Sequence, residues 1–415
     1  MRRSWPVGRL EGEAPAEPPL LSALPRMNIL YHFRTQGRGA EGVHIAGIAG
    51  ALEHLGHVVD FSSPTGTDPR RTCGADPFAG VDRRSRSWAW LARHCPGAAF
   101  ELLELGYNVA AWLRNSRLLK RKRYDFIYER HAFFLCATAW LARRRRIPLV
   151  IEINELVGDE RVRRQPTFRR LAERCDRFSL RRAALVTVVS PHLQRRVMAL
   201  GVPLERTLVL PNAVTEADYA SPAEGRQVRQ RYGLGEALLI GFVGWLVPWH
   251  RLEDLIEAVA SAASVRDLRL LIVGSGPLRA DLENLAAARG IGDRVLFVGA
   301  VPHESVREHI AAMDIAVIPH SNEYRSPIKL FEYMGQGKAV LAPRTEPIAM
   351  VVRQGDNGLL FEPGDMASFR AGLLQLVSEP ETRKRLGGQA RSDVLAKYTW
   401  DHNAARILEQ LGLER

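Results

Sequence analysis

The sequence predicts an α/β protein built from two Rossmann-like domains, each a doubly wound parallel sheet, that face each other across a cleft. From Met27 onward, short apolar segments rich in β-branched residues alternate with longer segments of helical periodicity. Each half of the chain contains six of the short segments. Strands that are apolar throughout are typical of parallel sheets with helices on both faces. The length of 415 residues fits two or three domains of about 100–200 residues each.

The expected strands of the first half lie at 28–33, 57–61, 126–129, 149–153, 185–189 and 207–210. Those of the second half lie at 238–244, 269–273, 295–298, 315–318, 339–342 and 358–361. The polar segment 215–230 has no strand pattern, so we interpret it as a linker between an N-terminal domain at 27–214 and a C-terminal domain at 231–397. A final helix at about 398–415 is expected to pack back on the first domain.

Residues 1–26 differ from the rest of the chain. They are rich in Pro, Glu and Ala and show neither helical nor strand periodicity. We expect either a disordered tail or an extension that precedes the natural start at Met27.

Composition excludes several classes of protein. Apolar residues make up 46% and charged residues 25% of the chain, which excludes a disordered or low-complexity protein. No apolar segment reaches the roughly 20 residues of a membrane-spanning helix, and no secretory signal is visible. The four cysteines form no CxxC pair, which indicates reduced thiols and a cytoplasmic location. Residues 27–220 carry a net charge of +12 and residues 221–415 a net charge of −1, so the first half is expected to meet an anionic partner.

Two glycine-containing loops follow strands of the second half. The first spans 241–251: Gly244 ends a strand, and the cation pair His250 and Arg251 precedes a helix. Glycine permits a close backbone approach, and a cation at a helix start can hold a phosphate. The second loop, at 273–277, contains Gly274 and fits a tight turn as well as it fits a phosphate or ribose contact.

The segment 326–338 carries the sharpest signal. Ser326 fits an N-cap and Pro327 the first helical position. The helix start that follows would present free N–H groups and a positive dipole end to an anion. Glu332, about two turns in, lies among apolar neighbours and needs hydrogen-bond partners that vicinal ribose hydroxyls would supply.

Five segments occur in one order: 242–244 with the following Pro-Trp-His, 273–277, Val298 and Gly299, 326–337, and 357–361. Together they resemble the family-4 retaining glycosyltransferases of the GT-B fold, particularly the bacterial polysaccharide-type members. The resemblance implies an N-terminal acceptor domain and a C-terminal domain that binds a nucleotide sugar. It also implies transfer of a hexose-type sugar from a UDP- or GDP-sugar to a glycan or lipid-linked acceptor of a cell-surface polysaccharide or glycolipid. No other cofactor is expected.

The resemblance assigns residues on the donor side. Glu332 matches the glutamate that holds the nucleotide ribose. The partner glutamate of that element should stand at Tyr324, and Glu323 could replace it only through a one-residue shift. The family's diphosphate-binding Arg and Lys fall on Trp245 and His250, so His250 or Arg251 is expected to supply the charge together with Lys329. The remaining donor contacts that we expect are Gly39 in the glycine loop after the strand 28–33, Gly244, Gly274, Val298, Ser326, Ile328 and Leu330.

The acceptor side departs from the family pattern. The family's histidine after the fourth strand falls near Asn154, so Asn154 is expected to contact the acceptor. His131 either faces the cleft or is a satisfied structural residue. No Asp-x-Asp element or metal-ligand spacing is present in the sequence, so we expect no obligatory metal. Charge on the leaving diphosphate would then be stabilised by a helix N-terminus and cations, and a phosphate oxygen would take the proton of the acceptor.

Three other interpretations concern the charge and the architecture. The basic runs 120–123 and 143–146 are compatible with a nucleic-acid-binding protein, but no such motif is present, and we expect no nucleic-acid partner. A sugar-nucleotide 2-epimerase shares the two-domain architecture and would need no acceptor. Aromatic and basic residues at 88–119 and 168–182 suggest peripheral docking on an anionic membrane at its cytoplasmic face, with ordinary helix packing as the alternative.

Overall fold

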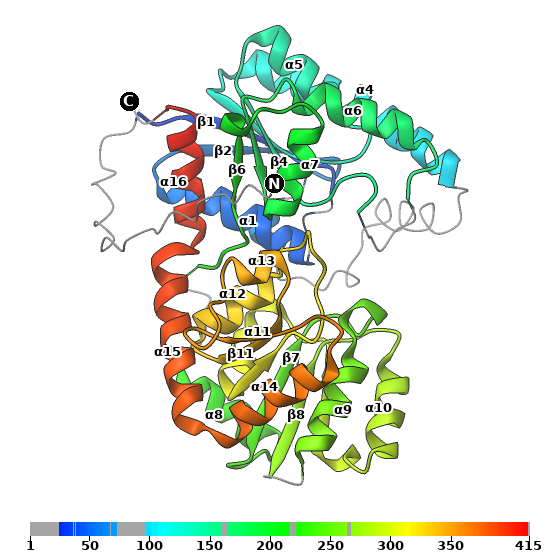
Figure 1. The fold of residues 1–415 in the computed structure, drawn as a ribbon. Helices are drawn as coiled ribbons and strands as arrows, with labels where there is room; N and C mark the ends of the chain where they lie inside the picture. Colours follow the sequence, from blue (N-terminus) through cyan, green and yellow to red (C-terminus); the bar gives the residue numbers. More distant parts are fainter. Residues whose placement is uncertain are drawn as a thin grey trace, which may run out of the picture.

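The structure is a computed structural model that describes residues 25–413, except 36, 38, 67, 73–96, 160–164, 216–218, 220 and 264–266. The predictions for residues 1–24 and for the aromatic residues Trp88 and Trp90 lie outside the described residues. The chain forms two α/β domains, each built around one parallel sheet (Figure 1).

The first sheet has the strand order β2-β1-β3-β4-β5-β6, with every neighbouring pair parallel. Its strands are β1 (Asn28–His32), β2 (Val58–Ser62), β3 (Phe126–Arg130), β4 (Leu149–Ile153), β5 (Leu185–Val188) and β6 (Thr207–Val209). Helices α1 (Gly39–His54) and α16 (Trp400–Gln410) cover one face. The helices of the other face are α4 (Gly97–Arg121), α5 (Ala137–Arg145), α6 (Arg169–Leu180) and α7 (Pro191–Ala199); the short elements are α2 (Pro69–Thr72) and η1 (Leu204–Arg206).

The second sheet has the strand order β12-β11-β10-β7-β8-β9 and is also parallel. Its strands are β7 (Leu238–Val243), β8 (Leu268–Val273), β9 (Val295–Gly299), β10 (Ile315–Val317), β11 (Ala339–Pro343) and β12 (Leu359–Phe361). The order reverses between β7 and β10, and ligands of such sheets bind outside the carboxyl ends of the strands at this point.

Helices cover both faces of this sheet. One face is covered by α9 (Leu252–Ala262), α10 (Arg279–Ala288) and α14 (Met366–Ser378), whose residues Leu255 and Phe369 belong to the core on that side. The opposite face is covered by α8 (Pro222–Arg231), α11 (His303–Ala312), α12 (Ile328–Gly335) and α15 (Pro380–Lys397). The short elements are η3 (Pro248–His250), η4 (Gly292–Arg294) and α13 (Glu346–Ala349). The predicted fold class is confirmed, and each expected strand agrees with the structure to within one residue at either end.

The segment expected as a linker is helical in its second part. Ser221 and Glu224 form a capping box at the start of α8. Gly225 lies so close to the backbone of Ala311 in α11 that a Cβ atom would meet its carbonyl carbon at 2.7 Å. The end of the interpreted linker therefore packs as part of the second domain.

The chain crosses between the domains twice, and the two crossings touch. Val214 and Thr399 form a parallel bridge, in which Val214 N donates to Tyr398 O and Trp400 N to Val214 O, both at 3.2 Å. Helix α16 then lies against α1, where Gly47 leaves the space that the Trp400 ring fills (Figure 1).

Candidate active site

The loops after β7 and β8 pack directly against each other. A Cβ atom at Gly274 would overlap the carbonyl oxygen of Gly244, and one at Gly276 would overlap that of Leu246. Gly274 N also donates to Gly299 O at 2.8 Å, which joins the loop to the end of β9. The glycines of the second loop are thus needed for the contact between the loops, as a tight turn requires. Contacts of Gly274 and Val298 with a nucleotide stay predictions.

Lys329 reaches from α12 to the carboxyl end of β7. Its Nζ lies 4.0 Å from the centre of the Phe242 ring, and a Cβ atom at Gly244 would stand only 2.5 Å from it. Gly244 therefore admits the ammonium group. Within the described part of the chain, the buried Nζ has no hydrogen-bond partner. Burial lowers the pKa of Lys329 to about 7, against the opposing charge of Glu332.

His250 lies beside this ammonium group but does not add a charge. Its ring meets Phe242 edge-on at 5.3 Å between ring centres, and its buried Nδ1 has no partner among the described residues. Burial, and then the charges of Lys329, Arg325 and His320, lower the pKa of His250 to about 2. The lowered pKa favours the neutral imidazole in the free protein, and a diphosphate contact of His250 stays a prediction.

Arg251 is held at the start of α9 instead of reaching the strand ends. Its backbone is left-handed, with φ 49°, and its Nε lies 2.6 Å from Oδ2 of Asp254. The guanidinium is thus already paired within its own helix turn, and a diphosphate contact of Arg251 stays a prediction. Lys329 is the cation that the structure places closest to Gly244.

The start of α12 differs from the prediction. The helix begins at Ile328, Pro327 occupies the N-cap position, and no side chain caps the helix. Leu330 N donates to Pro327 O at 3.0 Å, so its amide is not available to a ligand. Among the described residues, nothing accepts from the backbone N–H groups of Ile328 and Lys329. These two groups are the free donors of this helix start.

Ser326 joins the two domains instead of capping α12. Its Oγ accepts from Asn212 N at 3.0 Å, and the side-chain amide of Asn212 donates to the carbonyl of Ser326. The expectation of a Ser326 N-cap is wrong because the hydroxyl is already taken by a residue of the first domain.

Glu332 is the fifth residue of α12, closer to the helix start than predicted. It is half-buried between the buried residues Phe331 and Tyr333. The hydroxyl of Tyr333 accepts from Val243 N at 2.7 Å and fixes the helix to the end of β7. Glu332 and Lys329 therefore share one helix turn next to Gly244.

Glu323 and Tyr324 lie on the loop between β10 and α12. Tyr324 inserts into the core of the first domain, and its carbonyl accepts from Ser190 Oγ at 2.9 Å. The exposed carboxylate of Glu323 accepts from Glu346 N at 3.2 Å, at the start of α13. A role of Glu323 at the donor sugar stays a prediction.

A buried carboxylate organises the facing side of the first domain. Glu152 of β4 accepts from Tyr128 Oη at 3.0 Å, contacts His44 Nε2 at 3.0 Å, and pairs with Arg130. Asn154 donates to it at 2.6 Å, so the predicted acceptor residue is anchored to this cluster. Burial acts to raise the pKa of Glu152, but His44 and Arg130 outweigh it and the pKa is lowered.

His44 links the Glu152 cluster to Asn212, a residue of the first domain that binds the second. The Nδ1 of His44 lies 2.7 Å from Oδ1 of Asn212, the residue that binds Ser326. Gly39, with φ 61°, begins α1, the helix that carries His44. A chain of hydrogen bonds therefore links the Glu152 cluster to Ser326, just before α12, and helix α1 connects this chain to Gly39.

His131 has a structural partner. Its side chain is 6% exposed, and its Nε2 lies 2.8 Å from Oδ1 of Asp176 in α6. This contact fits the alternative of a satisfied structural residue, and a catalytic role stays a prediction.

Among the described residues, no three His, Cys, Asp or Glu side chains gather in a way that would hold a metal ion. No described helix is both long enough and apolar enough to cross a membrane.

The chain matches known families and proteins over most of its length. Residues 226–393 match the family described as "Glycosyl transferases group 1", and residues 39–213 match a "Glycosyl transferase 4-like domain". The D-inositol 3-phosphate glycosyltransferase of Geodermatophilus obscurus is 30% identical over 344 residues, which cover 76% of this chain and 74% of that protein. The chain belongs to the group 1 glycosyltransferases.

Other glycosyltransferases are similar over most of the chain. The alpha-D-kanosaminyltransferase of Streptomyces kanamyceticus is 27% identical over 66% of this chain and 73% of its own length. The crystal structure of Anabaena HepE in complex with UDP and glucose has a TM-score of 0.65 and 18% identity, with 93% of this chain and all of that chain covered. The structure of WaaG, a glycosyltransferase of lipopolysaccharide biosynthesis, has a TM-score of 0.62 and 19% identity, with 91% and 99% covered. The likeness to these structures concerns the GT-B fold, and the relatives do not favour the epimerase alternative.

Sequence reasoning missed the Glu152 cluster in the first domain of this glycosyltransferase. Arg130 and Glu152 were not singled out, although Glu152 stands between Ile151 and Ile153 in an apolar strand. A carboxylate in such a strand requires buried partners, and that signal could have found the cluster.

Proposed function

We propose that this glycosyltransferase moves a hexose-type sugar, with retention of configuration, from a UDP- or GDP-sugar to a glycan or lipid-linked acceptor. The acceptor would belong to a cell-surface polysaccharide or glycolipid. The observation that carries the proposal is the ammonium group of Lys329, which is buried under Gly244, one helix turn before Glu332, and has no hydrogen-bond partner among the described residues. A buried charge of this kind is stable only when it is paired, and the donor diphosphate supplies the missing anion.

The proposed chemistry assigns separate tasks to these groups. Lys329 and the N–H groups of Ile328 and Lys329 stabilise the charge that develops on the leaving diphosphate. Glu332 accepts hydrogen bonds from the ribose hydroxyls. The acceptor attacks from the face that the nucleotide leaves, and a departing phosphate oxygen takes its proton, without an obligatory metal. Asn154 positions the acceptor from the Glu152 cluster.

The comparisons support both kinds of nucleotide. Anabaena HepE has been solved with UDP and with UDP-glucose. A relative from Mycolicibacterium smegmatis, 27% identical over 58% of this chain, is a GDP-mannose-dependent mannosyltransferase. A lipid-linked or glycan acceptor agrees with the involvement of WaaG in lipopolysaccharide biosynthesis.

The deciding experiment screens nucleotide sugars for thermal stabilisation, because a ligand of the native state raises the melting temperature. We expect one UDP- or GDP-sugar to stabilise the protein and Lys329→Met to abolish the effect. Lys338→Met is the matched control, because Lys338 is half-buried and its ammonium group donates to Ala311 O at 2.7 Å. Stabilisation that survives Lys329→Met contradicts the assignment. The anomeric configuration of the product, read by NMR, tests retention.

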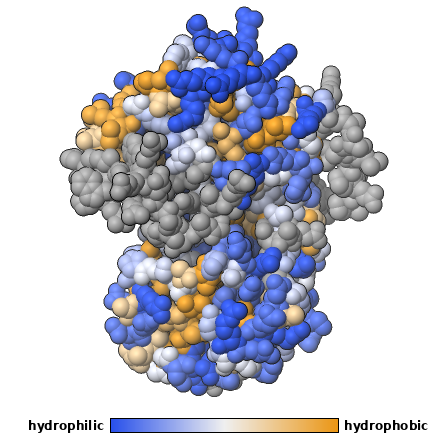
Figure 2. All heavy atoms as spheres, turned by 180° about the vertical axis from the view of Figure 1, so that it is seen from behind, coloured by the Kyte–Doolittle hydropathy of each residue, from blue (hydrophilic) through white to orange (hydrophobic). Residues whose placement is uncertain are grey.

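We also propose that the first domain docks on an anionic membrane at its cytoplasmic face. Exposed apolar side chains gather on α4 and α5; they are Leu102, Leu103, Val109, Trp112, Leu113 and Trp140. The rings of Trp112 and Trp140 stand 6.5 Å apart, which joins the two helices into one surface. Basic residues line a pocket at the ends of these helices: Lys120, Arg121, Lys122, Arg123, Arg145 and Arg146. Figure 2 shows orange side chains on the upper domain next to blue ones that project from its top. Apolar and basic groups side by side are typical of helices that lie in an anionic interface.

A further inference from the structure

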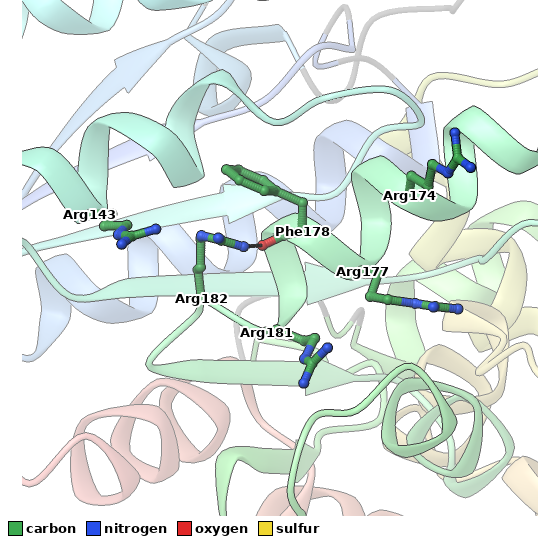
Figure 3. Close-up of a pocket in the computed structure, with 6 residues that line it drawn as sticks. All are labelled: Arg143, Arg174, Arg177, Phe178, Arg181 and Arg182. Atoms are coloured by element: carbon green, nitrogen blue, oxygen red, sulfur yellow. Dashed lines mark hydrogen bonds between the residues drawn. The ribbon is translucent and has the colours of Figure 1, made fainter.

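A second basic pocket lies on the outer face of the first domain. It has a volume of about 530 Å³ and is lined by Arg143, Arg174, Arg177, Phe178, Arg181 and Arg182. Figure 3 shows that Arg143 comes from α5 and the other side chains from α6 and the turn after it. Within the described part of the chain, none of the five guanidinium groups forms an ion pair with a carboxylate. We call this set the arginine pocket.

The arginine pocket lies away from the candidate active site. Helices α5 and α6 start near the carboxyl ends of β3 and β4 and run back toward the amino ends of the strands. Arg143 stands in the last turn of α5, and Arg181 follows the last residue of α6. The reacting groups meet at the carboxyl ends, so a ligand of the arginine pocket is neither the donor nor the reacting end of the acceptor.

Ordinary helix-end chemistry explains only part of the cluster. Cations are favourable at helix C-termini, and Arg182 uses this by donating to Phe178 O at 2.9 Å. Its guanidinium also covers the Phe178 ring at 3.8 Å from the centre, so the two side chains form one wall of the arginine pocket (Figure 3). Arg174 and Arg177 lie in the middle and last turns of α6, are exposed, and gain nothing from each other's charge.

The positions of two arginines are fixed by neighbouring segments. Gly201, with φ 93°, leaves room for Arg181, since a Cβ atom there would lie 3.2 Å from the Arg181 Nε. The backbone carbonyl of Arg181 also accepts from Arg206 Nη1 at 3.3 Å. Arg206 therefore holds the backbone at Arg181, and the contacts with Phe178 hold the Arg182 side chain, which lowers the entropy cost of binding.

We propose that the arginine pocket binds a phosphate group with two or more negative charges, either a phosphomonoester or a diphosphate. Guanidinium groups match phosphate oxygens in paired hydrogen bonds, and several together favour a multiply charged group over a singly charged diester. The bearer of the phosphate is either a lipid or a soluble molecule. The proposal stands independently of the donor reaction, because it uses no residue of the candidate active site.

The experiment measures binding of inorganic diphosphate to the full chain by calorimetry. We expect Arg177→Gln with Arg181→Gln to weaken one class of sites by about tenfold or more, because charge-assisted contacts are lost. The matched control is Arg226→Gln with Arg231→Gln, which removes the same charge from exposed positions on α8 of the second domain. Lys329→Met identifies any diphosphate bound at the donor site. Melting temperatures of all variants confirm that they are folded.

Vesicles separate the two sources of phosphate. The lipids are phosphatidylcholine with either phosphatidic acid, a phosphomonoester, or phosphatidylglycerol, a diester, at equal total charge. Stronger capture by phosphatidic acid that disappears in the pocket variant supports the proposal with a lipid as bearer. If the pocket variant loses diphosphate binding but the protein shows no preference for phosphatidic acid, the result supports the proposal with a soluble molecule as the bearer of the phosphate. Equal losses in the pocket and control variants on both probes overturn the proposal.

Discussion

Asn212 and Ser326 bind each other across the two domains through both backbone and side-chain groups. Asn212 N donates to Ser326 Oγ at 3.0 Å, and the Asn212 amide donates to the Ser326 carbonyl. Ser326 lies two residues before the start of α12, the helix that carries Lys329 and Glu332. The donor-side helix is thus positioned directly by the first domain.

Ser326→Ala is expected to lower the melting temperature and to weaken donor binding. The substitution leaves Asn212 N buried without an acceptor, at a cost of about 1–3 kcal/mol. Ser261→Ala is the control, because that exposed hydroxyl only donates to the carbonyl one turn earlier in α9. Calorimetric unfolding measures both variants, and equal melting temperatures for Ser326→Ala and wild type contradict the prediction.

Lys329→Met is expected to stabilise the free protein while it abolishes donor binding. The pKa of Lys329 is lowered to about 7 in the native state, so between pH 7 and the ordinary lysine value of 10.5 the unfolded chain binds more protons. The native lysine is therefore least favourable below pH 7, and the gain from methionine should be largest there and shrink as the pH rises. Melting curves at about pH 6 and about pH 9 test this. A lower melting temperature of the variant at both values is the contrary result.

Donor affinity should fall as the pH rises above about 7 in the wild-type protein. Below this value Lys329 is already charged, whereas above it binding must first take up a proton, at a loss of up to about tenfold per pH unit. Glu332 opposes the shift of Lys329, and His250 stays neutral throughout because its pKa is about 2. Lys329→Arg keeps its charge and should flatten the profile. Titration with an intact nucleotide sugar measures the effect, and a steep profile in Lys329→Arg assigns it to another group.

Glu332→Ala is expected to lose donor binding while the fold survives. Two hydrogen bonds to a charged acceptor are worth about 3–6 kcal/mol at roughly 1.5–3 each. Glu283→Ala is a suitable control, because Glu283 pairs with Arg279 on the exposed side of α10. The Michaelis constant and the turnover number are measured, and unchanged values would contradict the assignment of Glu332 to the nucleotide ribose.

Glu152→Gln is expected to destabilise the first domain by about 3–5 kcal/mol, because it leaves Arg130 without its buried counter-charge. Since the native pKa of Glu152 is lowered, its contribution is present at neutral pH and is lost as the pH falls below the ordinary carboxyl value of 4.5. The difference in unfolding free energy between wild type and variant should therefore be largest at neutral pH and shrink as the pH falls below 4.5, and denaturation at about pH 7 and about pH 3 measures it. Glu173→Gln, in the exposed pair with Arg169, should change little.

Vesicle flotation tests the proposed membrane surface. Wild type should float with anionic but not neutral vesicles, and less so when salt shortens the Debye length from about 10 Å at 0.1 M to about 3 Å at 1 M. Trp112→Ala with Trp140→Ala should remove the vesicle binding that persists at high salt, since the two tryptophans contribute apolar burial. Leu374→Ala is the control at a comparably exposed position on the second domain, and it should leave vesicle binding unchanged. Negligible flotation on both lipids favours a soluble acceptor.

The fold could be predicted because its signals are local. Apolar strands such as 149–153 and 238–244 and the helices between them are visible in the sequence without knowledge of their partners. The segment 326–338 also stands out locally, as a helix start that follows an expected strand. These signals depend on residues close together in the chain.

The unpredicted parts depend on residues far apart in the chain. Ser326 does not cap α12, and its hydroxyl instead accepts from Asn212, 114 residues away in the sequence. His131 pairs with Asp176, 45 residues away. His250 is neutral because burial against Phe242 and the nearby cations outweigh its ordinary basicity. Tyr324 belongs to the core of the other domain. None of these contacts leaves a periodic or compositional trace.

The bridge between Val214 and Thr399 limits how the domains can move. Two covalent connections that are hydrogen-bonded to each other act as one hinge, so we expect closure over a ligand to be rotation about a single axis near these residues. Sliding or twisting of one domain on the other would break the bridge. Because α16 is seated on α1 beyond the second crossing, proteolysis of either crossing should leave a nicked protein whose two fragments stay associated.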